Sequence, residues 1–252
     1  MVGIGPGDIS HMTLRARTAV EAAGAVCGYG TYIDLIRPLI QGKTVIATGM
    51  RKEVDRVRNA IDTARAGTRC ALVCSGDPGV YAMAGLVFEL CRENSVPVGS
   101  GPKDLTVEVI PGIPALCSGA ALLGAPLMHD FAAISLSDLL TPWPVIEKRI
   151  QMAAQADFVI AFYNPRSKKR NWQLERAKEI LLSHRLPETP VGLVTAAMRE
   201  DETILLTRLS ELDCTQAGMQ TTVFAGNSQT FIHNHRMVTP RGYRDKYELQ
   251  SS

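Results

Sequence analysis

The run Cys70-Ala71-Leu72-Val73-Cys74-Ser75-Gly76-Asp77-Pro78-Gly79 is the most informative part of the sequence. Its first five residues are apolar without interruption, which is typical of a strand buried on both faces of a parallel sheet. The five residues that follow all favour turns. Ligands of open α/β sheets bind beyond the carboxyl ends of the strands. The run therefore predicts an α/β protein with a binding loop directly after a central strand.

Two further glycine loops flank this run along the chain. One is Gly3-Ile4-Gly5-Pro6-Gly7-Asp8, after a short apolar start, and the other is Ile110-Pro111-Gly112-Ile113-Pro114, after a strand predicted at 107–110. The first loop has the spacing G-x-G-x-G and does not match the dinucleotide fingerprint G-x-G-x-x-G, which argues against a Rossmann dinucleotide site. Any single loop could be an ordinary turn. Three of them at strand ends predict one shared ligand site.

Apolar periodicity divides the rest of the chain into alternating elements. In the first half we expect helices at 13–23, 53–66, 81–92 and 113–123, and strands at 2–4, 25–28 and 44–47. In the second half we expect helices at 145–156 and 172–182, and strands at 132–136, 158–163, 191–196, 203–207, 221–225 and 236–239. The break at Gly124-Ala125-Pro126 predicts two α/β domains, 1–126 and 127–252, the first mainly parallel and the second mixed.

Composition limits the possible functions. Of 252 residues, 46% are hydrophobic, and 27 Lys and Arg against 25 Asp and Glu give a net charge of +2. This balance gives no reason to expect nucleic acid or a membrane surface as a partner. We expect no membrane span and no signal peptide. The six cysteines form no C-x-x-C pair, so we expect free thiols in a reducing cytoplasm and no metal site.

Several motifs, in their order along the chain, resemble the tetrapyrrole (corrin and sirohaem) methyltransferases, which use S-adenosylmethionine. Beyond the three glycine loops, the similarity narrows to the branch that methylates precorrin-3B at C17. It rests on Gly28-Tyr29-x-Thr31-Tyr32, Thr48-Gly49-Met50-Arg51, Ile134-Ser135-Leu136-Ser137-Asp138-Leu139-Leu140-Thr141-Pro142-Trp143, Phe162-Tyr163-Asn164-Pro165-Arg166-Ser167, Gly226-Asn227-Ser228 and Thr239-Pro240-Arg241-Gly242-Tyr243. The resemblance covers nearly the whole chain. It implies two α/β domains with the ligand cleft between them, and a homodimer.

The resemblance also implies the residues that contact the methyl donor, S-adenosylmethionine, whose product is S-adenosylhomocysteine. These are Pro6, Ser75, Gly76, Asp77, Val80, Pro114, Ala115, Asn164 and Ala197. Methyl transfer from a sulfonium needs neither a nucleophilic side chain nor a metal, because the protein only has to hold donor and acceptor in line. Asp77 could accept from amino or hydroxyl groups of the donor, or could form an Asx-turn before Pro78.

The acceptor implied by the resemblance is a macrocycle with many carboxylates, for which arginine is the preferred partner. Arg51 and Arg166 each follow a predicted strand, and Arg166 opens the basic run Arg166-Ser167-Lys168-Lys169-Arg170. Ser135 and Asp138 are further candidates for acceptor contacts. Lys168 and Lys169 fit a solvated loop as well as a binding site.

This branch also contracts the ring, which requires proton movement. Candidate acid-base residues are His129, Asp130, Ser137 and Tyr29. A histidine such as His129 is as readily a structural residue as a catalyst.

Three alternatives stay open. We favour metal-free precorrin-3B as the acceptor, but cobalt-factor III is an alternative. The methyl group could also go to another position of a corrin or sirohaem precursor. The chain could also be a binding module without activity. Relatives carry a longer apolar strand before the first glycine, so either this strand is very short or the natural start lies upstream.

Overall fold

The computed structural model describes residues 1–247. The chain divides into two compact units, Met1–Ala115 and a second that begins at Leu116. The two units divide after the first residue of helix α5 (Ala115–Leu123), whereas the sequence predicted a boundary after that helix, at 126. The reason is packing: Leu123 of α5 is fully buried with Val194 and Phe224 of the second unit. A glycine-proline break in the sequence does not reveal which sheet a neighbouring helix covers.

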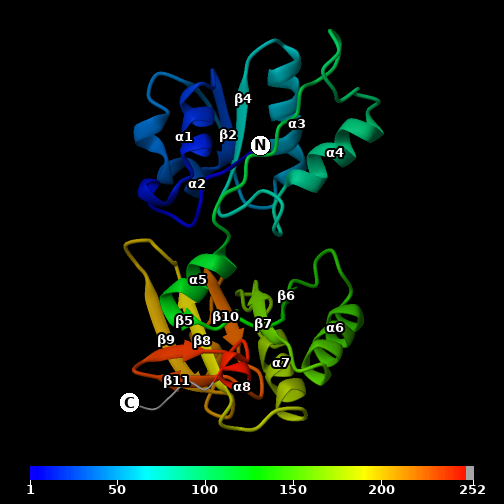
Figure 1. The fold of residues 1–252 in the computed structure, drawn as a ribbon. Helices are drawn as coiled ribbons and strands as arrows, with labels where there is room; N and C mark the ends of the chain where they lie inside the picture. The colour runs from blue at the N-terminus through cyan, green and yellow to red at the C-terminus, as the bar shows by residue number, and fades with distance from the viewer. Residues whose placement is uncertain (248–252) are drawn as a thin grey trace. The chain divides into compact units, whose positions relative to one another are not determined.

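Unit 1 is a parallel four-stranded sheet in the order β1-β4-β2-β3 (Figure 1). Its strands are β1 (Val2–Gly3), β2 (Ala25–Tyr29), β3 (Thr44–Thr48) and β4 (Cys70–Cys74). The central strand β4 pairs in parallel with both β1 and β2, as its uninterrupted apolar sequence predicts. Its inner residues are buried. The predicted parallel sheet is therefore confirmed, with β4 as a central strand.

Helices cover both faces of the unit 1 sheet. The helices are α1 (Leu14–Glu21), α2 (Gly30–Leu35), α3 (Glu53–Arg65) and α4 (Ala84–Glu93), with 3-10 turns at Ile9–His11 and Arg37–Leu39. One apolar cluster joins α1 and α2 to the sheet, and a second joins α3 and α4 to it. The two helix pairs lie on opposite sides of β2 and β4 in Figure 1.

Helix α3 buries a charged residue together with its apolar ones. Val57 and Ile61 are buried, whereas Val54 is 40% exposed and Arg56 takes an inward position. Arg56 can lie in the interior because its guanidinium donates hydrogen bonds to the Thr48 hydroxyl and the Gly49 carbonyl.

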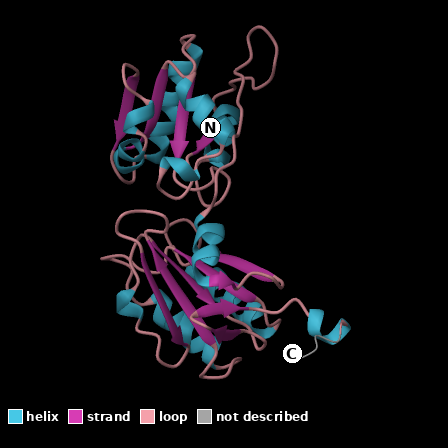
Figure 2. Cartoon of the chain, turned by 60° about the vertical axis from the view of Figure 1, so that its left-hand side comes forward, coloured by secondary structure: helices cyan, strands magenta, loops and turns pink. Residues whose placement is uncertain are grey.

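Unit 2 holds a mixed five-stranded sheet (Figure 2), and the order of its strands is β6-β7-β10-β8-β9 (Figure 1). Its strands are β6 (Phe131–Ser135), β7 (Val159–Tyr163), β8 (Pro190–Thr195), β9 (Thr203–Arg208) and β10 (Thr221–Ala225). Only β6 and β7 pair in parallel. The change from a parallel to a mixed sheet confirms the sequence prediction.

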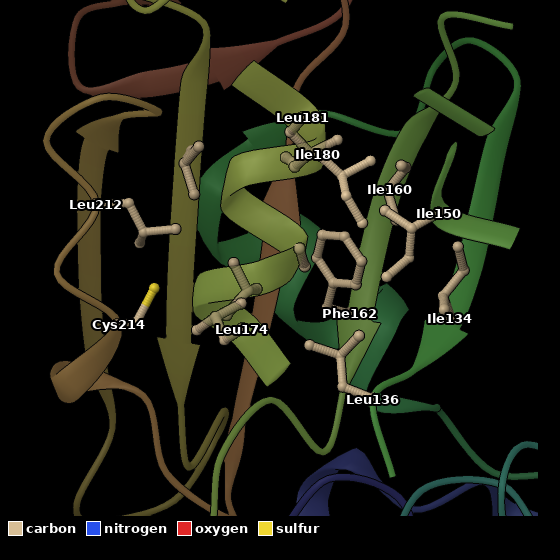
Figure 3. Packing of buried hydrophobic residues seen from close by; sticks show 14 of the residues in the cluster. Ile134, Leu136, Ile150, Ile160, Phe162, Leu174, Ile180, Leu181, Leu212 and Cys214 are labelled. Carbon is tan, nitrogen blue, oxygen red and sulfur yellow. The ribbon is translucent and has the colours of Figure 1, made fainter. Parts of the chain in front are cut away.

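The unit 2 sheet has a separate layer on each face. Helices α6 (Trp143–Gln155) and α7 (Gln173–Leu182) pack over Phe162 and Ile160 of β7, together with the 3-10 turn Cys214–Gln216 (Figure 3). The other face is covered by α5 and by Met237 of a small sheet. That sheet has the order β11-β12-β5, and its strands are Phe231–His233, Arg236–Val238 and Gly124–Ala125; the chain continues to α8 (Tyr243–Lys246).

Three local expectations are wrong. The strand expected at 107–110 is reduced to an isolated bridge between Ile110 and Val2, because β1 is only two residues long and offers little to pair with. Helix α4 begins at Ala84 and not at Tyr81, whose positive φ of 53° lies outside the right-handed helical region. Strands β5 and β11 and helices α2 and α8 were not expected at all. No helix in residues 1–247 is long and apolar enough to cross a membrane.

Candidate functional site

Three glycine loops of unit 1 meet at one point. The Gly5 N–H donates to the Gly76 carbonyl over 3.2 Å, and the Gly76 N–H donates back to the Gly5 carbonyl over 2.7 Å. The Gly3 N–H donates to the Ile110 carbonyl over 2.9 Å. We call this convergence the loop junction; its residues are Gly3–Asp8, Ser75–Val80 and Pro111–Ala115.

Glycine is required in the loop junction because backbones touch there. A Cβ added to Gly3 would lie 2.6 Å from the Gly76 carbonyl oxygen and 2.6 Å from the Gly112 nitrogen. A Cβ on Gly112 would overlap the same carbonyl oxygen. Gly5 and Gly76 also have positive φ angles, of 75° and 68°. Because these residues have no side chain, the backbones of the loops contact one another directly. A ligand could contact the same backbone equally closely.

Asp77 connects two of the loops. Its Oδ1 accepts from the Gly79 N–H at 2.7 Å, which is the Asx-turn foreseen for this residue. Its Oδ2 accepts from the Gly112 N–H at 3.1 Å. Each oxygen of a carboxylate has capacity for a second hydrogen bond. Asp77 therefore orders the loop junction and can still accept from a ligand.

The structure brings the donor-contact candidates of unit 1 together. Gly76 lies beside Pro114 and Ala115: a Cβ at Gly76 would be 3.4 Å from the Pro114 Cα and 3.8 Å from the Ala115 nitrogen. The Val80 N–H donates to the Asp77 carbonyl over 3.4 Å. Pro6 and Ser75 immediately follow and precede the paired glycines Gly5 and Gly76.

The two donor-contact candidates of unit 2 lie at one edge of its sheet. Strands β7 and β8 both pair antiparallel with β10, so they run in the same direction and end at the same edge. Asn164 follows β7 with φ of 50°, and Ala196, beside Ala197, follows β8 with φ of 50°. Such left-handed residues concentrate at functional sites. The Asn164 Nδ2 donates to the Ser135 Oγ over 3.0 Å, which joins a donor candidate to an acceptor candidate.

A buried arginine missed by the sequence analysis completes this edge. Arg170 is 7% exposed; its Nη2 donates to the Asn164 carbonyl over 3.0 Å, and its Nη1 lies 3.4 Å from the Ser137 Oγ. Its Nε is buried without a partner. Burial lowers the pKa of Arg170, and the nearby Asp138 carboxylate partly offsets this effect. Arg170 is the last residue of the basic run 166–170. The sequence of this run does not indicate which of its cations is buried.

Arg51 and Arg166, the two arginines predicted to bind the acceptor, have different surroundings. Arg51 is exposed, in a turn before α3, with φ of 62°. Arg166 is half-buried, and its Nη1 lies 3.5 Å from the Cys214 carbonyl. Arg170, and not Arg166, is the cation that contacts Ser137 and Asn164.

Tyr29 sits beside a second buried arginine that the sequence did not suggest. The guanidinium carbon of Arg56 is 5.8 Å from the centre of the Tyr29 ring, within range of a cation–π interaction. Arg56 donates to the Thr48 Oγ1 over 2.6 Å and to the Gly49 carbonyl over 2.8 Å. It therefore fixes the carboxyl ends of β2 and β3, where Tyr29 and Thr48 lie.

The remaining acid-base candidates are spread apart. His129 and Asp130 are exposed and precede β6, whereas Ser135 ends it and Ser137 follows it. Five strand residues separate the two groups by roughly 17 Å. The His129 Nδ1 accepts from the Asp130 backbone N–H at 2.8 Å. The structure thus gathers Ser135 and Ser137, with Asp138, at the Arg170 edge and leaves His129 and Asp130 at the other end of the strand.

Comparison with known proteins identifies the class to which this fold and these loops belong. The family model for tetrapyrrole (corrin/porphyrin) methylases matches residues 1–213. The chain therefore belongs to the tetrapyrrole methylase family.

The names of three relatives are more specific than the family model. A cobalt-factor III methyltransferase of Priestia megaterium is 50% identical over the whole chain, which spans only 46% of that longer protein. A probable cobalt-factor III C(17)-methyltransferase of Salmonella typhimurium is 49% identical over 96% of the chain and 98% of its own length. A precorrin-3B C(17)-methyltransferase of a Sinorhizobium species is 43% identical, with 96% of each chain covered.

Solved structures agree with the sequence relatives. The crystal structure of the methyltransferase CobJ superposes with a TM-score of 0.88 at 37% identity, covering 95% of this chain and 98% of that one. A uroporphyrin-III C-methyltransferase of Thermus thermophilus, solved with S-adenosylhomocysteine, gives a TM-score of 0.66 at 25% identity, covering 89% of this chain and 90% of that one. The predicted family and fold class are confirmed.

Proposed function

We propose that this protein transfers the methyl group of S-adenosylmethionine to C17 of a corrin precursor, with contraction of the ring, in cobalamin biosynthesis. The observation that carries the proposal is the loop junction, where the backbones of three loops meet and the Asp77 carboxylate keeps capacity for a further hydrogen bond. Such a cradle suits a ligand with adenosine and amino-acid groups, because backbone groups can approach it closely.

The acceptor is precorrin-3B or its cobalt-containing counterpart, cobalt-factor III. The sequence alone favoured the metal-free compound. The names of the two relatives at 49–50% identity favour cobalt-factor III, and the relative named for precorrin-3B is 43% identical. Cobalt-factor III is therefore the first acceptor to test.

The proposed donor contacts are the loop-junction residues Pro6, Ser75, Gly76, Asp77, Val80, Pro114 and Ala115, with Asn164 and Ala197 of unit 2. When bound, the donor supplies an electrophilic methyl group on a sulfonium. The role of the chain is to bind and orient, which is the main source of rate in such a displacement. Ser135, Asp138, Arg51 and Arg166 are kept as acceptor contacts.

For the proton movement of ring contraction, Ser137 and Tyr29 are the first residues to test, because each has a buried arginine beside it. His129 and Asp130 remain candidates of lower priority, since they lie far along β6 from Ser137. A homodimer and a cytoplasmic location complete the proposal, and light scattering on the purified protein measures the oligomeric state.

The decisive experiment incubates the purified protein with S-adenosylmethionine and each acceptor, and follows the product by mass spectrometry. We expect one added methyl group and an equal amount of S-adenosylhomocysteine. Binding of S-adenosylhomocysteine without methylation of any tetrapyrrole would instead favour a binding module.

Asp77→Ala tests the loop junction within the same proposal. We expect the dissociation constant for S-adenosylhomocysteine to rise about tenfold, because a charge-assisted hydrogen bond between the loops is lost. Asp104→Ala is the matched control: the Asp104 Oδ2 also accepts from a loop N–H, that of Gly101 at 2.9 Å, outside the loop junction. Equal affinities for the wild type and Asp77→Ala would remove Asp77 from the donor site.

A further inference from the structure

Two loops of unit 2 form a platform that the donor contacts leave unused. The first is the segment 135–143, which begins at the last residue of β6, and the second is the segment 165–173, which follows β7 and Asn164. The Gln173 Nε2 donates to the Asp138 Oδ2 over 3.0 Å, and the rings of Trp143 and Trp172 meet edge to face with centroids 4.7 Å apart. Together with the contact between Arg170 and Ser137, these interactions connect the two loops at three points.

The platform presents apolar side chains to solvent. Leu140 is 98% exposed, Leu139 is 70% exposed and Trp172 is 46% exposed. Single exposed apolar residues are common on protein surfaces. Here, however, two adjacent leucines are held outward by firm supports, since Leu136 before them is fully buried and Trp143 after them packs on the core. Exposed apolar side chains between two anchored residues point to a ligand or a partner.

Positive charge lies on the same loop as Trp172. Lys168 and Lys169 are exposed on the second loop. None of the ion pairs among residues 1–247 involves either lysine. Exposed apolar side chains and free cations on two connected loops complement a ligand that is apolar at its centre and carboxylated at its rim.

We propose that Leu139, Leu140 and Trp172 bind the ring face of the acceptor macrocycle, while Lys168 and Lys169 bind its peripheral carboxylates. The inference rests on the proposed function, because a tetrapyrrole has this distribution of apolar ring and charged rim. The hydrogen bond from Asn164 to Ser135 links the platform to a proposed donor contact. A second copy of the chain is the rival occupant, but it would not explain the two unpaired lysines.

The test measures binding of uroporphyrin III, a stable octacarboxylate, through its visible absorption band. We expect the double variant Leu139→Ala/Leu140→Ala to raise the dissociation constant at least tenfold and to leave the affinity for S-adenosylhomocysteine unchanged. Leu186→Ala is the matched control, since Leu186 is 65% exposed in the same unit but lies outside the platform. Leu140→Glu should weaken porphyrin binding further, by repulsion of the carboxylates.

Both tryptophans of the chain lie on the platform, so their fluorescence gives a second readout. We expect uroporphyrin III to quench it in the wild type at the same concentrations that shift the absorption band. Unchanged porphyrin affinity in both leucine variants would overturn the inference while leaving the methyltransfer proposal intact. Conversion of a wild-type dimer into monomers by the leucine variants would assign these residues to an interface between copies, and would also overturn it. A wild type that binds porphyrin but methylates no tetrapyrrole would contradict the proposed function alone.

Discussion

At the scale of single residues, some of the unusual backbone conformations fall in the loops that carry the candidate site. Arg51, Tyr81, Asn164 and Ala196 all have positive φ angles without being glycine, and each lies in a loop near the carboxyl end of a strand. Such conformations cost free energy of order 1 kcal/mol each and persist where the surroundings enforce them. The hydrogen bonds that the Asn164 carbonyl and side chain make to Arg170 and Ser135 supply that enforcement for one of them.

Gly112→Ala is predicted to disrupt the loop junction. The new Cβ would overlap the Gly76 carbonyl and lie 2.7 Å from the Gly3 carbonyl oxygen, so the loops must separate. Overpacking of this kind costs about 1–3 kcal/mol of unfolding free energy. We expect a lower Tm and a loss of S-adenosylhomocysteine binding by calorimetry. Gly49→Ala is the control because nothing lies within 4 Å of its added Cβ; equal behaviour of the two variants would refute the crowding argument.

At the scale of elements, hydrophobic patterning located most helices and strands. It failed where the structure of a segment depends on contacts with residues distant in the sequence. The Gly/Pro loops and the buried strand β4 were evident because their signal is local. The inward turn of Arg56 was not evident, because it depends on acceptors near β3, Thr48 and the Gly49 carbonyl. The short bridge at Ile110 depends in the same way on how little of β1 is available to pair.

Arg56→Met is predicted to loosen α3 from the end of β3. The change leaves the Thr48 hydroxyl and the Gly49 carbonyl without their donor, which costs about 1–3 kcal/mol of unfolding free energy. Urea denaturation measures the loss. Arg58→Met is the control, because Arg58 is exposed on the same helix. If both variants lose a similar amount of unfolding free energy, the buried hydrogen bonds of Arg56 do not stabilise the fold.

At the scale of the whole molecule, each unit has its own core, and each core contains a thiol whose ionisation opposes folding. Burial raises the pKa of Cys27 in unit 1 and of Cys214 in unit 2 to about 12. An unfolded thiol ionises near pH 9, so between these values the unfolded chain binds fewer protons than the folded one. Stability therefore falls as the pH rises above 9.

Cys27→Ala and Cys214→Ala test this alkaline sensitivity. In the wild type each buried thiol is expected to contribute a loss of about 1.4 kcal/mol per pH unit above 9. Unfolding free energies at pH 8, 9 and 10 should fall less steeply in each variant than in the wild type. Cys117→Ala should keep the wild-type slope, because Cys117 is exposed. A slope independent of the buried cysteines would assign the alkaline loss to other groups.

The sequence by itself determined the family, the α/β class, the parallel and mixed halves and the glycine loops that form the loop junction. These features depend on local signals: apolar runs, turn residues and motifs in a fixed order. The tertiary structure alone decided that Arg56 and Arg170 are buried, that α5 packs with unit 2, and that Leu139 and Leu140 face solvent on a fixed platform. Those outcomes depend on residues distant in the chain, whose meeting no local pattern encodes.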